Sequence, residues 1–409
     1  MLRSACLANC FDALAFKILS AVETSPRHSN QHEINAIRPI VQMFGEPQGC
    51  EKLNIPCSYI YADDDSVISN PGVLTLYDAR AKGRELGRTD RSEYRMYYRT
   101  NDATLRMEEG DLLFIAHRKK SDTPAVFAIV DKDSDALPWL KWLFGYTEQQ
   151  KTSFSGVDSD ILINRELPAR AYELFFAMGL DVPQNDDFLD EMIVRFKGTL
   201  PSTAEFSSYA RLISGCPNAG EVQSCTADDL LYYWYNTETK LFLSFEKYLL
   251  DEEINRGLSA ERFISLSKTF LNRRKARAGQ SLENHIEQIF IDRNIAYSRT
   301  PVTEGKSRPD YIFPSIEAYR DPAFPSMHLY MLGVKTTCKD RWRQILTEAA
   351  RIKTKHLLTI EPGISENQTM EMKQQDVRLV LPRCLHSSFS DHQKEWIMGV
   401  EDFLKVVSD

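Results

Sequence analysis

The segment from Arg308 to Glu348 constrains this chain of 409 residues more than any other. It contains R-P-D-Y-I-F-P and, after a gap, an apolar strand-like run that ends in a lysine, M-L-G-V-K-T-T-C-K-D-R-W-R-Q-I-L-T-E. Two carboxylates, Asp310 and Glu348, can hold a metal ion that polarises a phosphate and lowers the pKa of a bound water. Lys335 can orient that water and offset the charge that develops on phosphorus. The pattern predicts a Mg²⁺-dependent site for phosphodiester cleavage.

Charged side chains follow Lys335 within a few residues. A second group of charged side chains lies near the start of the C-terminal third of the chain. Lysine and arginine can donate to guanine edges in the major groove, and an aspartate can accept from a cytosine amine. The candidates for reading bases are Lys339, Asp340 and Arg341, and Arg343 is expected to contact DNA beside them. A second basic cluster, which we expect to hold the DNA backbone or the central bases, consists of Arg274, Lys275 and Arg277.

The residues from about 272 to about 382 resemble the catalytic domain of EcoRII-type restriction endonucleases. The matching motifs are R-R-K-A-R-A-G-Q-S-L-E, R-P-D-Y-I-F-P-S, G-V-K-T-T-C-K-D-R-W-R-Q-I-L-T-E-A and H-L-L-T-I-E-P-G-I-S-E-N-Q, and weaker similarity extends back to about Phe196. The resemblance implies a PD-(D/E)XK nuclease fold, Mg²⁺ as cofactor and a homodimer. It also implies cleavage of both strands of DNA at short palindromes with CC and GG arms.

The chain departs from the general superfamily pattern at one position. The carboxylate expected two residues before the lysine is replaced by Gly333. In the EcoRII-type branch the following helix supplies this group, and Glu348 occupies the matching position. The resemblance therefore implies that Asp310, Lys335 and Glu348 form the core of the site, with Glu283 as an auxiliary carboxylate.

The spacing of apolar residues after Asp340 is consistent with a carboxylate supplied by a helix. Trp342, Ile345, Ala349 and Ile352 recur at intervals of three or four, which predicts an amphipathic helix over 340–353. Glu348 then lies on the side of Ile345 and Ile352, where it can face the end of the lysine strand. The alternative for a glutamate on such a helix is a solvated side chain.

Length and charge limit the remaining possibilities. A chain of 409 residues is long enough for two or three domains. The net charge of −8 argues against a general polycation, so DNA binding requires local basic patches. Eight cysteines without a C-x-x-C pair are typical of free thiols in a reducing cytoplasm. The first 23 residues predict an amphipathic helix, and without 18 successive apolar residues we expect no membrane span.

The C-terminal third alternates helix and strand patterns, which predicts a mixed central sheet flanked by helices. We expect strands at 311–313, 329–337, 356–360 and 377–381, and helices at 281–293, 340–353, 365–373 and 391–407. Before this region, the sequence predicts a long helix over 228–256 whose apolar stripe serves core or dimer packing.

The N-terminal half is mainly β in pattern. Short β-type runs at 59–61, 73–77, 94–99, 111–117 and 125–131 predict a small barrel or sandwich. EcoRII-type enzymes carry a B3-like DNA-binding pseudobarrel in the equivalent place, which binds a second, effector copy of the site. We therefore expect a β-rich effector domain at 1–155, a connecting region with a helix over 165–178 at 156–195, and a catalytic and dimerisation domain at 196–409.

Together these features predict a type II restriction endonuclease that cuts a CCWGG-like site in double-stranded DNA and is regulated by its N-terminal domain. A cognate DNA methyltransferase is the expected genetic partner, without implied physical contact. Two alternatives stay open from the sequence. One is a DNA-binding regulator with a non-cleaving nuclease fold, and the other is a nicking or repair nuclease.

Overall fold

A computed structural model of the chain describes residues 6–24, 32–118, 121–147, 150, 154–180, 182, 188–218, 225–257 and 260–408. Within these ranges, the side chains of residues 22, 260–268, 270–272, 275, 339 and 340 are not described. The chain forms two compact units, an N-terminal unit (Ser4–Pro183) and a C-terminal unit (Gln184–Asp409). Each is considered by itself.

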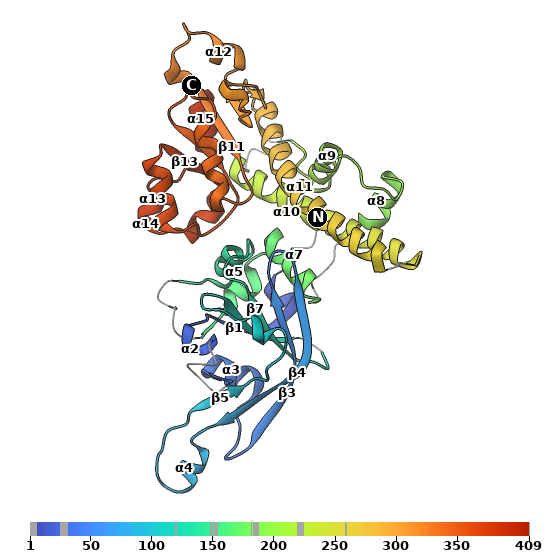
Figure 1. Cartoon of the computed structure of the whole chain (residues 1–409), viewed down its shortest axis with the longest axis vertical. Helices are drawn as coiled ribbons and strands as arrows, with labels where there is room; N and C mark the ends of the chain where they lie inside the picture. Colours follow the sequence, from blue (N-terminus) through green and yellow to red (C-terminus); the bar gives the residue numbers. More distant parts are fainter. Residues whose placement is uncertain are drawn as a thin grey trace. The chain divides into compact units, whose positions relative to one another are not determined.

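In the described part of the N-terminal unit, eight strands form one sheet in the order β2-β5-β4-β3-β7-β6-β1-β8 (Figure 1). The strands are β1 (Phe11–Ile18), β2 (Glu33–Asn35), β3 (Lys52–Ala62), β4 (Val67–Asp78), β5 (Tyr94–Tyr97), β6 (Leu112–Arg118), β7 (Ala125–Val130) and β8 (Ser155–Gly156). Strands β3 and β7 pair in parallel, and the other neighbours are antiparallel. The expected mainly β N-terminal domain is therefore present.

Both faces of the middle strands are covered, which is why they read as apolar runs. One face contributes Tyr59, Ile115 and Phe127 to a core that also includes Ile40 of α3 (Arg38–Phe44). On the other face, the ring of Phe114 contacts helices α5 (Leu137–Phe144) and α7 (Ala169–Ala177) through their phenylalanines. Because α7 packs on this sheet, the expected connecting region at 156–195 is divided between the two units.

Two expectations for the N-terminal unit are wrong. The first residues do not form one amphipathic helix, because Phe11–Ile18 is strand β1, paired along β6, between the short helices α1 (Leu7–Cys10) and α2 (Ala21–Thr24). A short apolar run covered on two faces has no periodicity that separates strand from helix. The helix expected over 165–178 begins only at Ala169, after Pro168, and the preceding helix α6 covers Ser159–Asn164.

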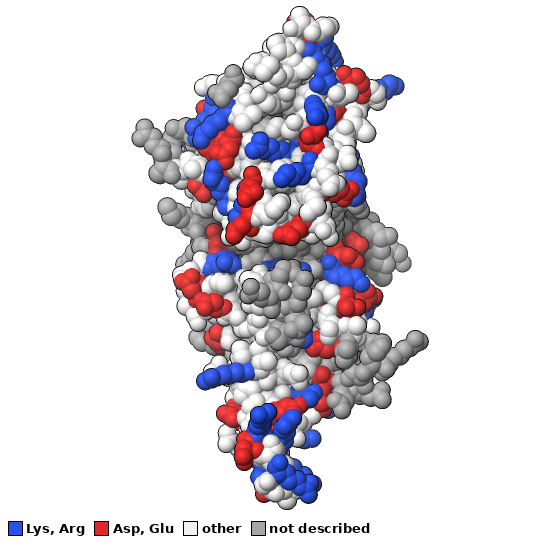
Figure 2. Space-filling view, turned by 90° about the vertical axis from the view of Figure 1, so that its left-hand side faces the viewer, with Lys and Arg blue, Asp and Glu red and all other residues white. Residues whose placement is uncertain are grey.

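An excursion between β4 and β5, residues 79–93, extends from the N-terminal sheet and contains helix α4 (Ala81–Glu85). It contains five basic residues, namely Arg80, Lys82, Arg84, Arg88 and Arg91. Arg80 pairs with Glu93 and Arg84 pairs with the buried Asp78. Figure 2 shows blue lysine and arginine side chains gathered at the lower end of the view, where this excursion lies.

The C-terminal unit begins with helices that pack on one another. They are α8 (Leu189–Arg195), α9 (Thr203–Ile213), α10 (Ala227–Asn255) and α11 (Ala260–Asp292), and α10 matches the long helix expected over 228–256. Met192 of α8 is fully buried against Phe206 of α9 and Phe245 of α10. The helix expected over 281–293 is thus the last part of a much longer one.

The sheet of the C-terminal unit has the order β13-β12-β11-β10-β9 in the part that the structure describes. Its strands are β9 (Ser298–Arg299), β10 (Tyr311–Phe313), β11 (Tyr330–Val334), β12 (Lys355–Leu358) and β13 (Val377–Val380). Pairing is antiparallel from β9 to β11 and parallel from β11 to β13. This is the mixed central sheet that the sequence predicts.

Elements cover both faces of this sheet. On one face Phe313 contacts Phe290 of α11 and Phe403 of α15 (Val400–Ser408). On the other face the crossover from β11 to β12 contains a 3-10 helix, η6 (Lys339–Thr347), whose Ile345 lies over Gly333. The C-terminal part also contains α12 (Ile316–Arg320), α13 (Glu366–Gln374) and α14 (Asp391–Lys394).

Two helix expectations in this unit are wrong. The segment expected to be an α-helix over 340–353 is a 3-10 helix that ends at Thr347, because Glu348 is extended and Ala349 takes a φ of 46°. The helix expected over 391–407 is interrupted between α14 and α15, since the backbone of Met398 pairs with Leu379 and Leu381 at the edge of the sheet.

Candidate active site

Asp310 and Lys335 meet at the ends of two paired strands. Asp310 lies directly before β10 and Lys335 directly after β11, and the antiparallel register of Tyr311 with Leu332 brings them together. The Lys335 Nζ donates to Asp310 Oδ2 at 3.0 Å, and the backbone N–H of Val334 donates to the same oxygen at 2.7 Å. The ion pair therefore has a fixed place at one end of the sheet.

Glycine at position 333 has a steric reason. A Cβ at Gly333 would lie 2.7 Å from Cγ2 of Ile345, a distance that real Cβ atoms do not show. Ile345 of η6 fills the space where the side chain of a carboxylate would begin, so no acidic residue fits there. Glu348, three residues after Ile345, brings a carboxylate to the same pair of strands.

Burial and mutual repulsion disfavour ionisation of two glutamates at this site. Burial and then the charge of Asp310 raise the pKa of Glu348 to about 7, against the pull of Lys335. Burial and the charge of Asp310 also raise the pKa of Glu283 on α11, although Arg299 donates to its carboxylate at 3.2 Å. The structure thus brings together all four residues expected at the core of the site.

A divalent cation fits this arrangement of charges. Carboxylate oxygens are the ligands that Mg²⁺ prefers, and a cation between them would relieve the repulsion that raises both glutamate pKa values. Asp310, Glu348 and Glu283 would hold it. Among the described residues, no group of three His, Cys, Asp or Glu side chains is close enough to form a ready metal site.

The candidates for base reading lie on η6, in the crossover that leads to Glu348. Arg341 is exposed. Arg343 forms two hydrogen bonds with Glu371 of α13, at 2.9 and 3.0 Å, and its guanidinium lies 5.1 Å from the ring of Trp342. The side chains of Lys339 and Asp340 lie outside the described residues.

The second basic cluster lies on α11 and is engaged in helix packing. Arg274 donates to the buried Glu246 of α10 at 2.5 Å. Arg277 is half-buried between the rings of Phe206 and Phe242, and it donates to the backbone oxygen of Pro201. The side chain of Lys275 lies outside the description. These contacts give Arg274 and Arg277 a structural role before any DNA contact.

Two residues near the site are not predicted by any pattern in the sequence. Arg299 of β9 donates to both Glu283 and Glu287 of α11, which fixes the auxiliary carboxylate. Lys355 opens β12 and its ammonium lies against the backbone of Glu348. A lysine before an apolar strand usually lies in solvent at the strand end. The fold shows instead that Lys355 is buried, with 5% of its surface exposed.

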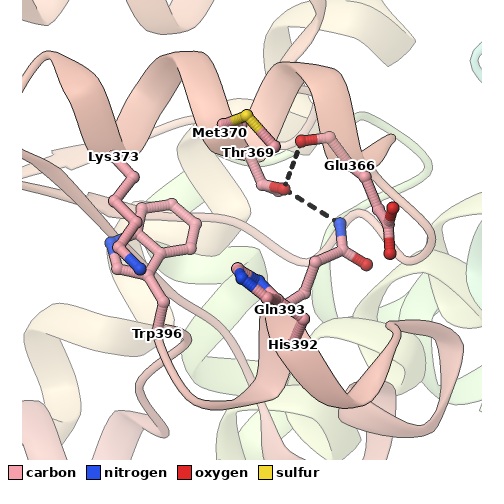
Figure 3. A pocket seen from close by; sticks show the side chains of 7 residues that line it. All are labelled: Glu366, Thr369, Met370, Lys373, His392, Gln393 and Trp396. Atoms are coloured by element: carbon pink, nitrogen blue, oxygen red, sulfur yellow. Dashed lines mark hydrogen bonds between the residues drawn. The ribbon is translucent and has the colours of Figure 1, made fainter.

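A separate pocket of about 190 Å³ lies between α13 and the segment that begins with α14 (Figure 3). It is lined by Glu366, Thr369, Met370, Lys373, His392, Gln393 and Trp396. Gln393 donates to the Thr369 hydroxyl, which donates to the backbone oxygen of Glu366. None of the expected site residues lines it.

Comparison with known proteins agrees with the C-terminal site. The family model described as EcoRII C terminal matches residues 242–404. The type II restriction enzyme EcoRII of Escherichia coli is 39% identical over 220 residues, which are 53% of this chain and 54% of that protein. The chain therefore aligns with about half the length of this curated relative.

Two solved structures are similar to part of the chain. Metal-depleted Ecl18kI in complex with uncleaved, modified DNA has a TM-score of 0.45 and 17% identity, covering 54% of this chain and 82% of that one. The complex of restriction endonuclease PspGI with substrate DNA has a TM-score of 0.44 and 16% identity, covering 51% and 94%.

The match to the EcoRII C-terminal family confirms the resemblance stated from the sequence. It includes Glu283, Asp310, Lys335 and Glu348, so the cluster at the ends of β10 and β11 lies inside the matched region. In the part of the chain that the structure describes, no cysteine forms a disulfide bond. Within the described ranges, no helix is both long and apolar enough to cross a membrane.

Proposed function

We propose that this protein is a type II restriction endonuclease that cuts both strands of a short palindromic DNA site with CC and GG arms, in a Mg²⁺-dependent reaction. The observation that supports this most is the convergence of Asp310, Lys335 and two glutamates with raised pKa values at one end of a mixed sheet. That arrangement is the catalytic end of a PD-(D/E)XK domain, with the second carboxylate moved to Glu348.

Each residue of the cluster has a role in the proposed hydrolysis. Bound Mg²⁺ would polarise the phosphate and lower the pKa of a bound water. Asp310 and Glu348, with Glu283 in support, hold the cation once they are ionised. Lys335 orients the attacking water and stabilises the negative charge on the phosphate oxygens in the transition state, because its ammonium is already fixed by Asp310 at 3.0 Å.

Sequence recognition is proposed for the crossover that carries η6. Lys339, Asp340 and Arg341 read the CC and GG arms, and Arg343, now paired with Glu371, joins them when DNA competes for its guanidinium. Arg274, Lys275 and Arg277 support backbone contacts from α11. A homodimer places one protomer on each half-site, so that the palindrome is cut symmetrically. A DNA methyltransferase of the same specificity would protect the host genome.

For the N-terminal unit we propose a B3-like effector domain that binds a second copy of the DNA site. The sheet of mainly antiparallel strands and the basic excursion at 79–93 support this proposal. Arg88 and Arg91 are exposed on that excursion, where they can contact phosphates. Binding of the effector copy would regulate the catalytic unit.

Digestion of phage DNA with purified protein and Mg²⁺, followed by sequencing of the ends, tests the proposed function. We expect discrete fragments whose ends share one palindrome with CC and GG arms, carry 5′-phosphates and disappear with EDTA. DNA methylated at that palindrome is the control and stays intact. Single-strand nicks alone, or a shift in gel mobility without any cleavage, would refute the proposal in favour of a nicking nuclease or a regulator.

A further inference from the structure

The crossover between β11 and β12, residues 335–354, carries both the candidate base readers and Glu348. Strands β11 and β12 are parallel, so the crossover starts at the carboxyl end of β11 and returns to the amino end of β12. Buried charged side chains lie at both ends of β12. Lys355 is its first residue and is 5% exposed, and Glu361 follows its last residue and is also 5% exposed.

Lys355 holds the end of the crossover. Its Nζ donates to the backbone oxygens of Glu348 at 2.5 Å, Ala349 at 2.7 Å and Ile352 at 2.5 Å. An ammonium has three protons, so all of its donors are directed at this one turn. The turn needs such support because Ala349 has a φ of 46°, a left-handed conformation that costs about 1 kcal/mol or more in a residue with a Cβ.

Glu361 holds the start of the crossover. Its Oε2 accepts a hydrogen bond from the backbone N–H of Cys338, the residue that precedes η6. The first amides of a helix have no partner within the helix, and a carboxylate at this position satisfies one of them. Cys338 itself is fully buried, so the backbone at the entry to the base-reading segment is fixed by this contact.

We propose that Lys355 and Glu361 are positioning residues that hold the two ends of the crossover, Lys355 for the carboxylate of Glu348 and Glu361 for the base-reading segment. The inference rests on the proposed function of Glu348 and η6. Both residues act through backbone contacts and neither touches DNA or metal. Loss of Lys355 should therefore weaken metal binding, and loss of Glu361 should weaken sequence discrimination.

Binding of Mn²⁺ to the full-length protein without DNA, followed by electron paramagnetic resonance, tests the role of Lys355 apart from cleavage. We expect Lys355→Met to weaken Mn²⁺ binding by about tenfold to a hundredfold, the range for residues that orient metal ligands. Lys353→Met is the matched control, because Lys353 is two residues away and its side chain is 87% exposed. Equal Mn²⁺ affinity in Lys355→Met and wild type would overturn the assignment.

Affinity for cognate and random duplexes in EDTA tests the role of Glu361. We expect Glu361→Leu, which has no oxygen to accept from the backbone N–H of Cys338, to lower the cognate-to-random ratio by about tenfold while Mn²⁺ affinity stays unchanged. Lys355→Met should instead weaken Mn²⁺ binding and leave the cognate-to-random ratio unchanged. If both variants change both quantities in parallel with their melting temperatures, the two residues serve only stability and the proposal fails.

Lys355→Gln keeps the test decisive if Lys355→Met does not fold, since an amide still donates to two of the three carbonyls. We expect an intermediate Mn²⁺ affinity for Lys355→Gln, and wild-type affinity would overturn the proposal. Failure of the proposed function is recognised separately, because wild-type protein would then cut no DNA in Mg²⁺. The Mn²⁺ measurements would still decide whether Lys355 positions Glu348.

Discussion

The two units use buried carboxylates in opposite ways. In the N-terminal unit, burial raises the pKa of Asp111 to about 6, but both of its oxygens accept backbone hydrogen bonds, from Glu108 at 2.8 Å and Lys132 at 2.9 Å. In the C-terminal unit, burial raises the pKa of Glu348 to about 7, and within the described residues no hydrogen bond to its carboxylate is present. Asp111 organises a turn, whereas Glu348 faces Asp310. A raised pKa alone therefore does not distinguish a structural carboxylate from one at a candidate site, and the hydrogen-bond partners and charged neighbours have to be compared as well.

Two pairs of arginines differ between the units in the opposite sense. Arg274 and Arg277 of the C-terminal unit are engaged by Glu246 and by aromatic rings. Arg88 and Arg91 of the N-terminal unit lie exposed on the excursion at 79–93. We therefore expect chemistry and base reading in the C-terminal unit and mainly phosphate contacts in the N-terminal unit.

Removal of either partner of the Asp310–Lys335 pair should have the largest effect. Lys335→Ala or Asp310→Ala should lower cleavage by about a thousandfold or more, because the proposed mechanism has these side chains act on metal and phosphate. Specific binding should survive. Single-turnover cleavage and binding of cognate duplex in Ca²⁺ measure the two effects. Lys353→Ala is the control, and loss of specific binding in Lys335→Ala with the fold intact would contradict the assigned role.

Base reading by the crossover is tested by Arg341→Ala. A good bidentate base contact contributes about 1–3 kcal/mol of discrimination, so the cognate-to-random affinity ratio should fall by roughly 10- to 100-fold. Competition binding at fixed salt measures this ratio. Arg378→Ala, which removes an exposed arginine from β13, should leave it unchanged. An unchanged ratio in Arg341→Ala would place base reading elsewhere.

Separation of the units tests whether the N-terminal unit restrains the catalytic one. A fragment of residues 184–409 should fold, dimerise and cut single-site DNA at least as fast as the full chain, since removing a regulatory domain leaves the chemistry intact. A fragment that begins at Phe196 should be less stable, because it lacks α8 and the fully buried Met192. Analytical ultracentrifugation measures whether the 184–409 fragment dimerises, and cleavage of a single-site plasmid measures its activity. A folded 184–409 fragment without cleavage, beside an active full chain, would argue against restraint.

The smallest expected effect is a pH-dependent change in stability. The folded-state pKa of Glu348, about 7, is above its ordinary value of 4.5, so the folded state retains a proton that the unfolded state has lost. Stability should therefore fall as pH rises from about 4.5 to about 7. Glu348→Gln should remove this loss and stabilise the metal-free protein at pH 8 by on the order of 1 kcal/mol after solvent screening.

Urea unfolding of the 184–409 fragment at pH 5 and pH 8 measures this difference. The wild-type fragment and its Glu348→Gln variant should be equally stable at pH 5, where Glu348 is protonated. Mg²⁺ at pH 8 should stabilise the wild type more than Glu348→Gln. Glu395→Gln, which changes an exposed carboxylate, is the control. Equal stability of wild type and Glu348→Gln at pH 8 without metal would contradict the raised pKa.

The sequence alone determined most of the C-terminal sheet and the four residues at its end. Strand β10 covers 311–313 as expected, and β11 lies within the expected 329–337 but ends at Val334, because short buried strands are visible in the local pattern while their exact ends are not. It also determined the resemblance to EcoRII-type enzymes, since those motifs are long. Strands β3 to β7 of the N-terminal unit followed from the same kind of pattern.

Only the tertiary structure decided how the crossover is built and what holds it. Trp342, Ile345 and Ile352 are buried as the helical pattern implies, but the chain leaves the helix at Glu348. The ammonium of Lys355, which has no part in that local pattern, donates to the carbonyls of Glu348, Ala349 and Ile352. Strand β1 was missed because its apolar run is covered on both faces. These choices depend on partners distant in the sequence, such as β6 for β1 and Ile345 for Gly333, and local periodicity contains no information about them.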